Sequence, residues 1–139
     1  MQAIDSSRSF GQWAARGAAA FCGAFAVFQA TLALGAPFGR MVWGGSSPVL
    51  PDNLRAASVG AAVYLLLAGG LMLVRSGDWG RGWPRLPVFA FNVFLALQLA
   101  LNTAANLAAK TGAERFGMGA ASAIGCLLCV AALFSGRRS

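Results

Sequence analysis

The sequence predicts an all-α fold, a membrane-embedded four-helix bundle with both termini in the cytoplasm. Four apolar stretches occupy most of the 139 residues, and charged residues are almost confined to the gaps between them. The chain is 58% hydrophobic and only 11% charged, with a mean hydropathy of +0.64. Soluble domains carry roughly a quarter of their residues as charged side chains, so this composition indicates lipid rather than water as the solvent.

The four spans are expected at about residues 14–35, 55–74, 87–109 and 117–134. An α-helix rises about 1.5 Å per residue, so about 20 apolar residues cross a hydrocarbon core of about 30 Å. The spans use most of the chain, which predicts a single four-span transmembrane domain, 1–139. A cleaved signal peptide ending near residues 33–35 is the alternative for the first span, although its apolar run is long for such a segment.

Basic residues in the short tails and connections predict the orientation of the spans, because the cytoplasmic side carries more of them. The tails and the second connection hold seven: Arg8, Arg16, Arg75, Arg81, Arg85, Arg137 and Arg138. The first and third connections hold four: Arg40, Arg55, Lys110 and Arg115. We therefore expect both termini in the cytoplasm and the first and third connections outside.

The net charge of +7 does not indicate nucleic-acid binding, because the basic residues stand singly or in pairs along the membrane edges. Anionic lipid head groups account for them better. The chain has no histidine, which excludes imidazole catalysis and histidine-ligated metals. No catalytic or metal-binding motif is present, so we expect no catalytic residues and no cofactor.

The fourth span contains a row of small residues at every fourth position: Gly117, Ala121, Gly125 and Cys129. Such a row lets helix backbones approach closely, and we interpret it as a helix-packing ridge. Cys126 and Cys129 also form a CxxC, the spacing of redox-active cysteines. Thiol exchange needs accessible thiolate, which an apolar helix in mid-membrane does not provide, so packing is the favoured interpretation.

Amide side chains in the spans need protein or water around them, because they are costly when they face lipid. Gln98, Asn102 and Asn106 are spaced by four and share one helix face, and Gln29 lies in the first span. The predicted orientation puts Gln29, Asn102 and Asn106 in the outer half of the membrane. They either hydrogen-bond between helices or line a small polar cavity that opens to the outside.

The first connection is too apolar for an ordinary solvated loop, since it contains Phe38, Met41, Val42 and Trp43 among glycines and prolines. It either folds back over the bundle as a cap that carries Arg40, or it holds an interfacial Trp43 beside a snorkelling Arg40. Glu114 and Arg115 in the third connection form either a solvated turn or the other wall of the site. The candidate ligand-binding residues are Gln29, Arg40, Trp43, Gln98, Asn102, Asn106, Glu114 and Arg115.

Short motifs along most of the chain resemble an uncharacterised family of short bacterial four-span membrane proteins. They are Gln29, Leu34-Gly35-Ala36-Pro37-Phe38-Gly39, Trp43-Gly44-Gly45, Leu50-Pro51, Leu54-Arg55, Asn102, Asn106 and Glu114-Arg115. The family more often has Trp where Phe38 stands. The resemblance implies a bacterial inner-membrane location and places these residues at the outer end, but it carries no activity.

We therefore expect a non-enzymatic, multi-pass protein of the bacterial inner membrane. It would bind a small amphiphile or lipid at its outer face, or act as a small partner subunit. The alternatives are an oligomeric small-molecule transporter and a membrane thiol/quinone oxidoreductase. Its expected partners are the lipid bilayer and either a homo-oligomer or a larger membrane complex, and no nucleic acid is expected.

Overall fold

The computed structural model describes residues 2–80 and 82–134, and in these the prediction of an all-helical protein is confirmed. There are four long helices and no strand among the described residues. The helices are α1 (Gln2–Ala33), α2 (Asp52–Ser76), α3 (Arg85–Leu107) and α4 (Gly119–Ala132). A 3₁₀ turn, η1 (Gly39–Met41), lies in the first connection, and a π-helical segment, η2 (Ala113–Met118), leads directly into α4.

Four helical segments are long and apolar enough to cross a membrane: Ser9–Ala33, Asp52–Ser76, Arg85–Leu107 and Ala113–Ala132. These lengths are typical of a multi-pass membrane protein. The first helix begins well before the predicted span, at Gln2. Apolar content marks only the part of a helix that lipid can cover, whereas an existing helix extends readily through polar residues.

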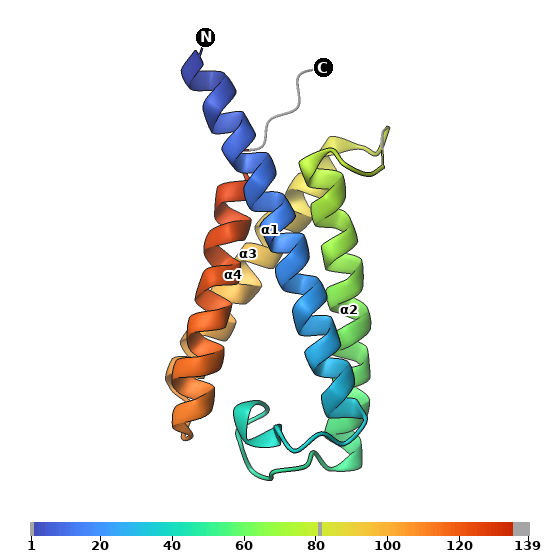
Figure 1. Cartoon of the computed structure of the whole chain (residues 1–139), viewed down its shortest axis with the longest axis vertical. Helices are drawn as coiled ribbons and strands as arrows, with labels where there is room; N and C mark the ends of the chain where they lie inside the picture. Colours follow the sequence, from blue (N-terminus) through green and yellow to red (C-terminus); the bar gives the residue numbers. More distant parts are fainter. Residues whose placement is uncertain (1, 81, 135–139) are drawn as a thin grey trace.

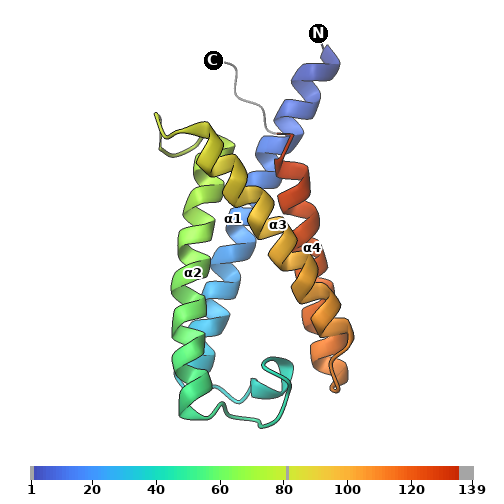
Figure 2. The ribbon, with the colours of Figure 1, turned by 180° about the vertical axis from the view of Figure 1, so that it is seen from behind.

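The helices form two pairs, α1 with α2 and α3 with α4, and α1 also packs against α4 (Figure 1). The pairs lie close together where α2 leads into α3 and diverge toward the opposite end, as the reverse view also shows (Figure 2). We call the closed end the Trp79 end, after the connection at residues 77–84. The open end, which holds the first and third connections, is the Trp43 end.

Small side chains allow the helices to meet closely at their crossing. A Cβ placed on Gly69 of α2 would lie 3.4 Å from the Ala19 carbonyl oxygen of α1. A Cβ on Gly125 of α4 would lie 2.6 Å from the Phe21 ring, too close for any side chain. The core around this crossing includes Ala18, Cys22, Ala68, Met72, Leu95, Leu99 and Cys129.

The row of small residues in the fourth span is divided between the interior and the surface. Gly125 and Cys129 are buried and Ala121 is half-buried, but Gly117 is exposed. A row of every fourth residue turns by about 40° per step around a helix of 3.6 residues per turn. Gly117 also lies in the π-helical segment, so the row does not form one continuous contact in the described chain.

Charged side chains fasten the Trp79 end. Arg16 of α1 donates two hydrogen bonds, both 2.7 Å, to the carboxylate of Asp78. Arg75 at the end of α2 donates to the carbonyl oxygens of Ala132 (3.2 Å) and Leu133 (2.8 Å), which otherwise lack a partner where α4 ends. All the helices except α3 are joined at this end by these bonds.

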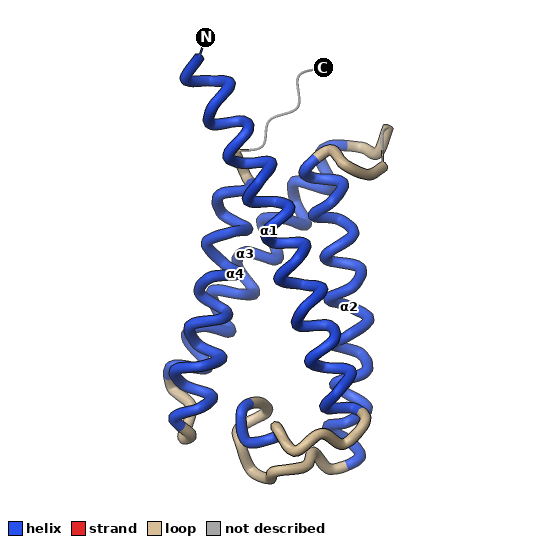
Figure 3. The backbone as a smooth tube through the Cα atoms, in the orientation of Figure 1, coloured by secondary structure: helices blue, strands red, loops and turns tan. Residues whose placement is uncertain are grey.

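At the Trp43 end the first connection folds back between the diverging helix pairs (Figure 3). Val42 and Leu50 are buried against Leu32 of α1. The Gly39 N–H donates to the Pro48 carbonyl oxygen at 2.8 Å and closes the connection on itself. Of the two interpretations of this segment, the structure therefore favours the one in which it folds back over the bundle.

Candidate ligand-binding cavity

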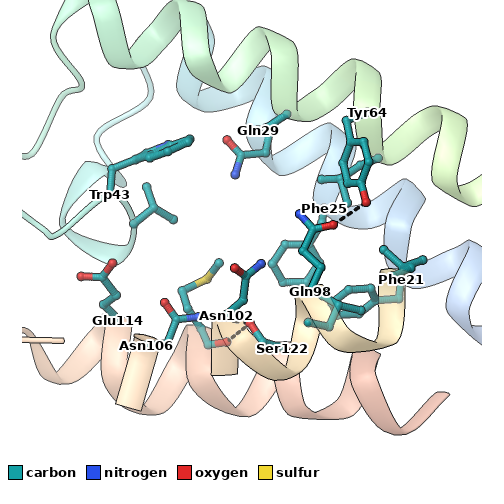
Figure 4. Close-up of a pocket in the computed structure, with 16 residues that line it drawn as sticks. Phe21, Phe25, Gln29, Trp43, Tyr64, Gln98, Asn102, Asn106, Glu114 and Ser122 are labelled. Carbon is teal, nitrogen blue, oxygen red and sulfur yellow. Dashed lines mark hydrogen bonds between the residues drawn. The ribbon is translucent and has the colours of Figure 1, made fainter. Parts of the chain in front are cut away.

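A cavity of about 300 Å³ lies at the Trp43 end, with residues from all four helices, the first connection and η2 in its walls (Figure 4). Its wall is partly apolar, with Phe21, Phe25, Leu65, Leu95 and Leu99 among the lining residues. Its polar lining residues are Gln29, Trp43, Tyr64, Gln98, Asn102, Asn106, Glu114 and Ser122. The space exists because the helix pairs diverge here, and the folded-back connection closes only part of it.

The cavity contains six of the eight residues predicted as ligand contacts: Gln29, Trp43, Gln98, Asn102, Asn106 and Glu114. Arg40 and Arg115 are not among its lining residues, and both are exposed. Arg40 contributes its backbone instead, since its carbonyl oxygen accepts a hydrogen bond from the Thr111 hydroxyl at 3.0 Å. Arg115 directly follows Glu114 on a helical turn, and neighbours on a helix do not share a face.

A tight turn at residues 43–45 forms one end of the cavity. Trp43 (φ 54°), Gly44 (φ 83°) and Gly45 (φ 63°) all adopt the left-handed conformation, which a Trp rarely does. The turn directs the Trp43 indole N–H to the Ser58 hydroxyl at 3.2 Å. A Cβ on Gly45 would lie 2.6 Å from the Thr111 methyl carbon, so only glycine lets the first connection approach the third this closely.

Glu114 stands in the wall opposite Trp43 and is only 6% exposed. Its Oε1 accepts the Gly44 N–H at 3.0 Å. Its other oxygen, Oε2, is buried and accepts no hydrogen bond from any described residue. Of the two interpretations of the third connection, the structure favours the wall of a site over a solvated turn.

Two of the amides join neighbouring helices. Asn106 of α3 donates from Nδ2 to the Ser122 hydroxyl of α4 at 3.1 Å, and Ser122 donates to the Met118 carbonyl oxygen at 2.8 Å. Tyr64 of α2 donates its hydroxyl to Gln98 Oε1 of α3. Interhelical bonding and cavity lining, which the sequence presented as alternatives, therefore occur together in these residues.

Gln29 and Asn102 extend from opposite walls toward the middle of the cavity (Figure 4). The oxygen Oε1 of Gln29 is buried and has no hydrogen-bond partner in the described chain. Asn102 is exposed, as is Trp43, which is 43% exposed. The cavity is therefore open to its surroundings beside these two residues and closed around Gln29 and Glu114.

Sequence reasoning missed Tyr64, Ser122 and Ser58 as polar members of this region. Tyr64 is the only tyrosine in the chain, and a polar tip inside an apolar span was a signal for it. Ser122 and Ser58 gave little signal, because serine often satisfies itself on the carbonyl oxygen one turn earlier. The aromatic rings of Phe21 and Phe25 were hidden among many other apolar residues of the first span.

The cysteines lie outside the cavity lining. All three are free thiols, with Cys22 and Cys129 buried in the core at the helix crossing. Cys126 donates its thiol to the Ala96 carbonyl oxygen at 3.4 Å. Among the described residues, no group of three or more His, Cys, Asp or Glu residues is placed to hold a metal ion.

Comparison of the chain with known proteins finds no matching family model, no similar curated protein and no similar solved structure. The family resemblance read from the short motifs therefore stays a prediction. Function is inferred below from the cavity and from the distribution of charge.

Proposed function

We propose that this chain is a multi-pass protein of the bacterial inner membrane that binds a small amphiphile in the cavity at its Trp43 end. Four span-length apolar helices support the membrane location. The excess of basic residues in the tails and second connection supports a cytoplasmic Trp79 end and an outer Trp43 end. The cavity would then open near the outer leaflet.

The observation that carries the proposal is a cavity whose walls are largely apolar but which contains two buried oxygens without partners, Gln29 Oε1 and Glu114 Oε2. Buried polar atoms in native proteins are nearly always hydrogen-bonded, so unpartnered ones that face a cavity indicate a missing partner. A volume of about 300 Å³ is at the small end of ligand sites, which span about 300–1,000 Å³. It suits one polar group and a short apolar segment.

Binding is better supported than catalysis by the groups in this wall. Glu114 is the single carboxylate among the lining residues, and no lysine or arginine joins it there. Acid–base and hydrolytic schemes generally use two such groups. A thiol oxidoreductase has less support, because two of the three cysteines are buried at the helix crossing and none lines the cavity.

Filling the cavity tests the proposal. Ala61 of α2 lines the cavity, and Ala61→Phe would occupy part of it. Ala56 is exposed on the same helix, so Ala56→Phe is the matched control. We expect decyl-chain amphiphiles to raise the unfolding temperature of the wild type and the Ala56→Phe variant in mild detergent, and to leave Ala61→Phe unchanged. Equal shifts in all three proteins would contradict binding in this cavity.

The orientation has its own test. In a variant without native cysteines, Ser46 in the first connection and Asp78 in the second are replaced in turn by Cys. A membrane-impermeant maleimide added to intact cells, after the outer membrane is permeabilised, should label position 46 but not position 78. Labelling of position 78 alone would place the cavity at the cytoplasmic side.

A further inference from the structure

We propose that the ligand of this cavity carries a primary ammonium group, which binds to the carboxylate of Glu114. This inference rests on the proposed function and names the chemical class of the ligand. It follows from three observations on the cavity: the state of Glu114, the absence of a cation in the described walls, and the kind of polar and aromatic groups that face the space.

Glu114 is more than nine-tenths buried and only half satisfied. Its Oε1 accepts the Gly44 N–H, while Oε2 faces the cavity without a partner (Figure 4). A buried carboxylate is costly unless it is paired and hydrogen-bonded. The fold therefore holds an acceptor in place for which this chain provides no complete set of donors.

The described chain does not supply the missing positive charge. The ion pairs among the described residues are Arg16 with Asp78 and Arg55 with Asp52, and neither includes Glu114. Arg40 and Arg115 are close to Glu114 along the backbone or across the turn, but both are exposed and neither lines the cavity. A cation that pairs with Glu114 would therefore come with the ligand.

The other side chains favour a donor rather than an acceptor. Gln29 Oε1 is a second buried oxygen without a partner in the described chain, so the cavity has two acceptors in need of N–H groups. Aromatic rings from Trp43, Phe25 and Tyr64 line the same space. Ring faces attract cations within about 6 Å, and hydrogen bonds to an ionised group are stronger than neutral ones. An anionic head group would meet oxygens and ring faces instead.

The test compares three amphiphiles with the same decyl chain: decylamine, decanol and decanoate. Binding is measured on the full chain in phosphatidylcholine nanodiscs. We expect decylamine to bind most tightly to the wild type. Glu114→Gln keeps the shape and the acceptor for Gly44 but removes the charge, so it should weaken decylamine binding about tenfold or more and leave decanol within about twofold.

Two further variants keep the result interpretable. Asp52→Asn makes the same chemical change at an exposed position of the Trp43 end and should leave all three affinities unchanged. Gln29→Leu removes the second acceptor and should weaken decylamine about threefold, a smaller loss because the acceptor is uncharged. It provides the readout if Glu114→Gln does not fold.

The outcomes separate this inference from the proposed function. If decanol or decanoate binds the wild type as tightly as decylamine, or if both Glu114→Gln and Gln29→Leu leave decylamine binding unchanged, the ammonium inference is wrong while amphiphile binding stands. If none of the three amphiphiles binds the wild type, both are wrong. A preference for decylamine that is lost in these variants supports both.

A primary ammonium reaches this cavity either as a free amine or as the head group of an ethanolamine phospholipid. Adding phosphatidylethanolamine to the nanodiscs distinguishes the two sources. Competition with decylamine, together with lipid that stays on the wild type but not on Glu114→Gln in native mass spectrometry, would identify the lipid. Decylamine binding that is unaffected by this lipid would identify a free amine.

Discussion

The two ends of this bundle are built differently from similar helices. At the Trp79 end the helices cross on glycine and alanine, and arginine side chains join α1 to the second connection and α2 to the end of α4. At the Trp43 end the helix pairs diverge, and a loop with three left-handed residues stands between them. Buried oxygens without partners face the cavity that results. The closed end provides stability, and the open end provides space in which a ligand can be held.

The comparison teaches that divergence at one end depends on close contact at the other. Helices in lipid gain little from the hydrophobic effect, so their association depends on close packing and hydrogen bonds. Gly69 and Gly125 concentrate this packing near the crossing. The Trp43 end is then stabilised by contacts of the loop, which is a weaker arrangement that leaves the cavity open.

The largest effect is expected at the crossing. Gly125→Leu would place side-chain atoms where the Phe21 ring now lies, and overpacking of this kind costs about 1–3 kcal/mol or more. The free energy of unfolding in mixed micelles should fall by about 3 kcal/mol. Gly23→Leu on α1, where a Cβ meets no atom within 4 Å, is the control. An unchanged stability of Gly125→Leu would mean that the helices do not meet there.

The next effect is expected in the loop. Gly45→Ala combines a left-handed backbone with a contact of 2.6 Å to Thr111, and should destabilise the protein by about 2 kcal/mol. Gly44→Ala shares the backbone conformation, but its Cβ meets no atom within 4 Å. The difference between the two variants in thermal unfolding measures the close approach of the first and third connections. Equal losses would show that the loop does not pack on Thr111.

Asn92 separates the two kinds of buried polar group. It is fully buried in α3, and neither its oxygen nor its nitrogen has a partner in the described chain, but unlike Gln29 it does not line the cavity. Asn92→Leu removes this cost and should stabilise the protein by about 1–2 kcal/mol in the same unfolding assay. A loss of stability would mean that Asn92 binds a buried water or another partner.

The smallest effect is expected for the hydrogen bond between Asn106 and Ser122. Bonds between transmembrane helices contribute about 0.6 kcal/mol on average. A double-mutant cycle of Asn106→Ala and Ser122→Ala should give a coupling energy near that value. A coupling near zero would assign both side chains to the cavity alone, whereas a value above about 2 kcal/mol would make them a main support of the Trp43 end.

Part of the site was predictable because it follows from local periodicity. Gln98, Asn102 and Asn106 share a face in any α-helix, and the apolar content of the first connection indicated that it contacts the bundle. The roles of these amides were not predictable. Whether Asn106 reaches Ser122, or Gln98 reaches Tyr64, depends on the distance and rotation of helices that are far apart in the sequence.

The charged residues show the same limit. Arg40, Glu114 and Arg115 looked equivalent as polar residues near the outer ends of the spans, yet the structure buries Glu114 and exposes both arginines. Glu114 is buried because the left-handed turn at Gly44 brings a backbone N–H to it from the first connection. No pattern along the chain shows that the two connections meet.

The sequence by itself determined the solvent, the helical class and the approximate positions of the four spans, because hydropathy and helix length are local properties. Only the tertiary structure decided that the helices close at one end and open at the other, which polar atoms are paired, and that Glu114 Oε2 and Gln29 Oε1 are not. The physical reason is that a cavity is defined by the separation of surfaces, and this separation is set by contacts at the far end of the same helices.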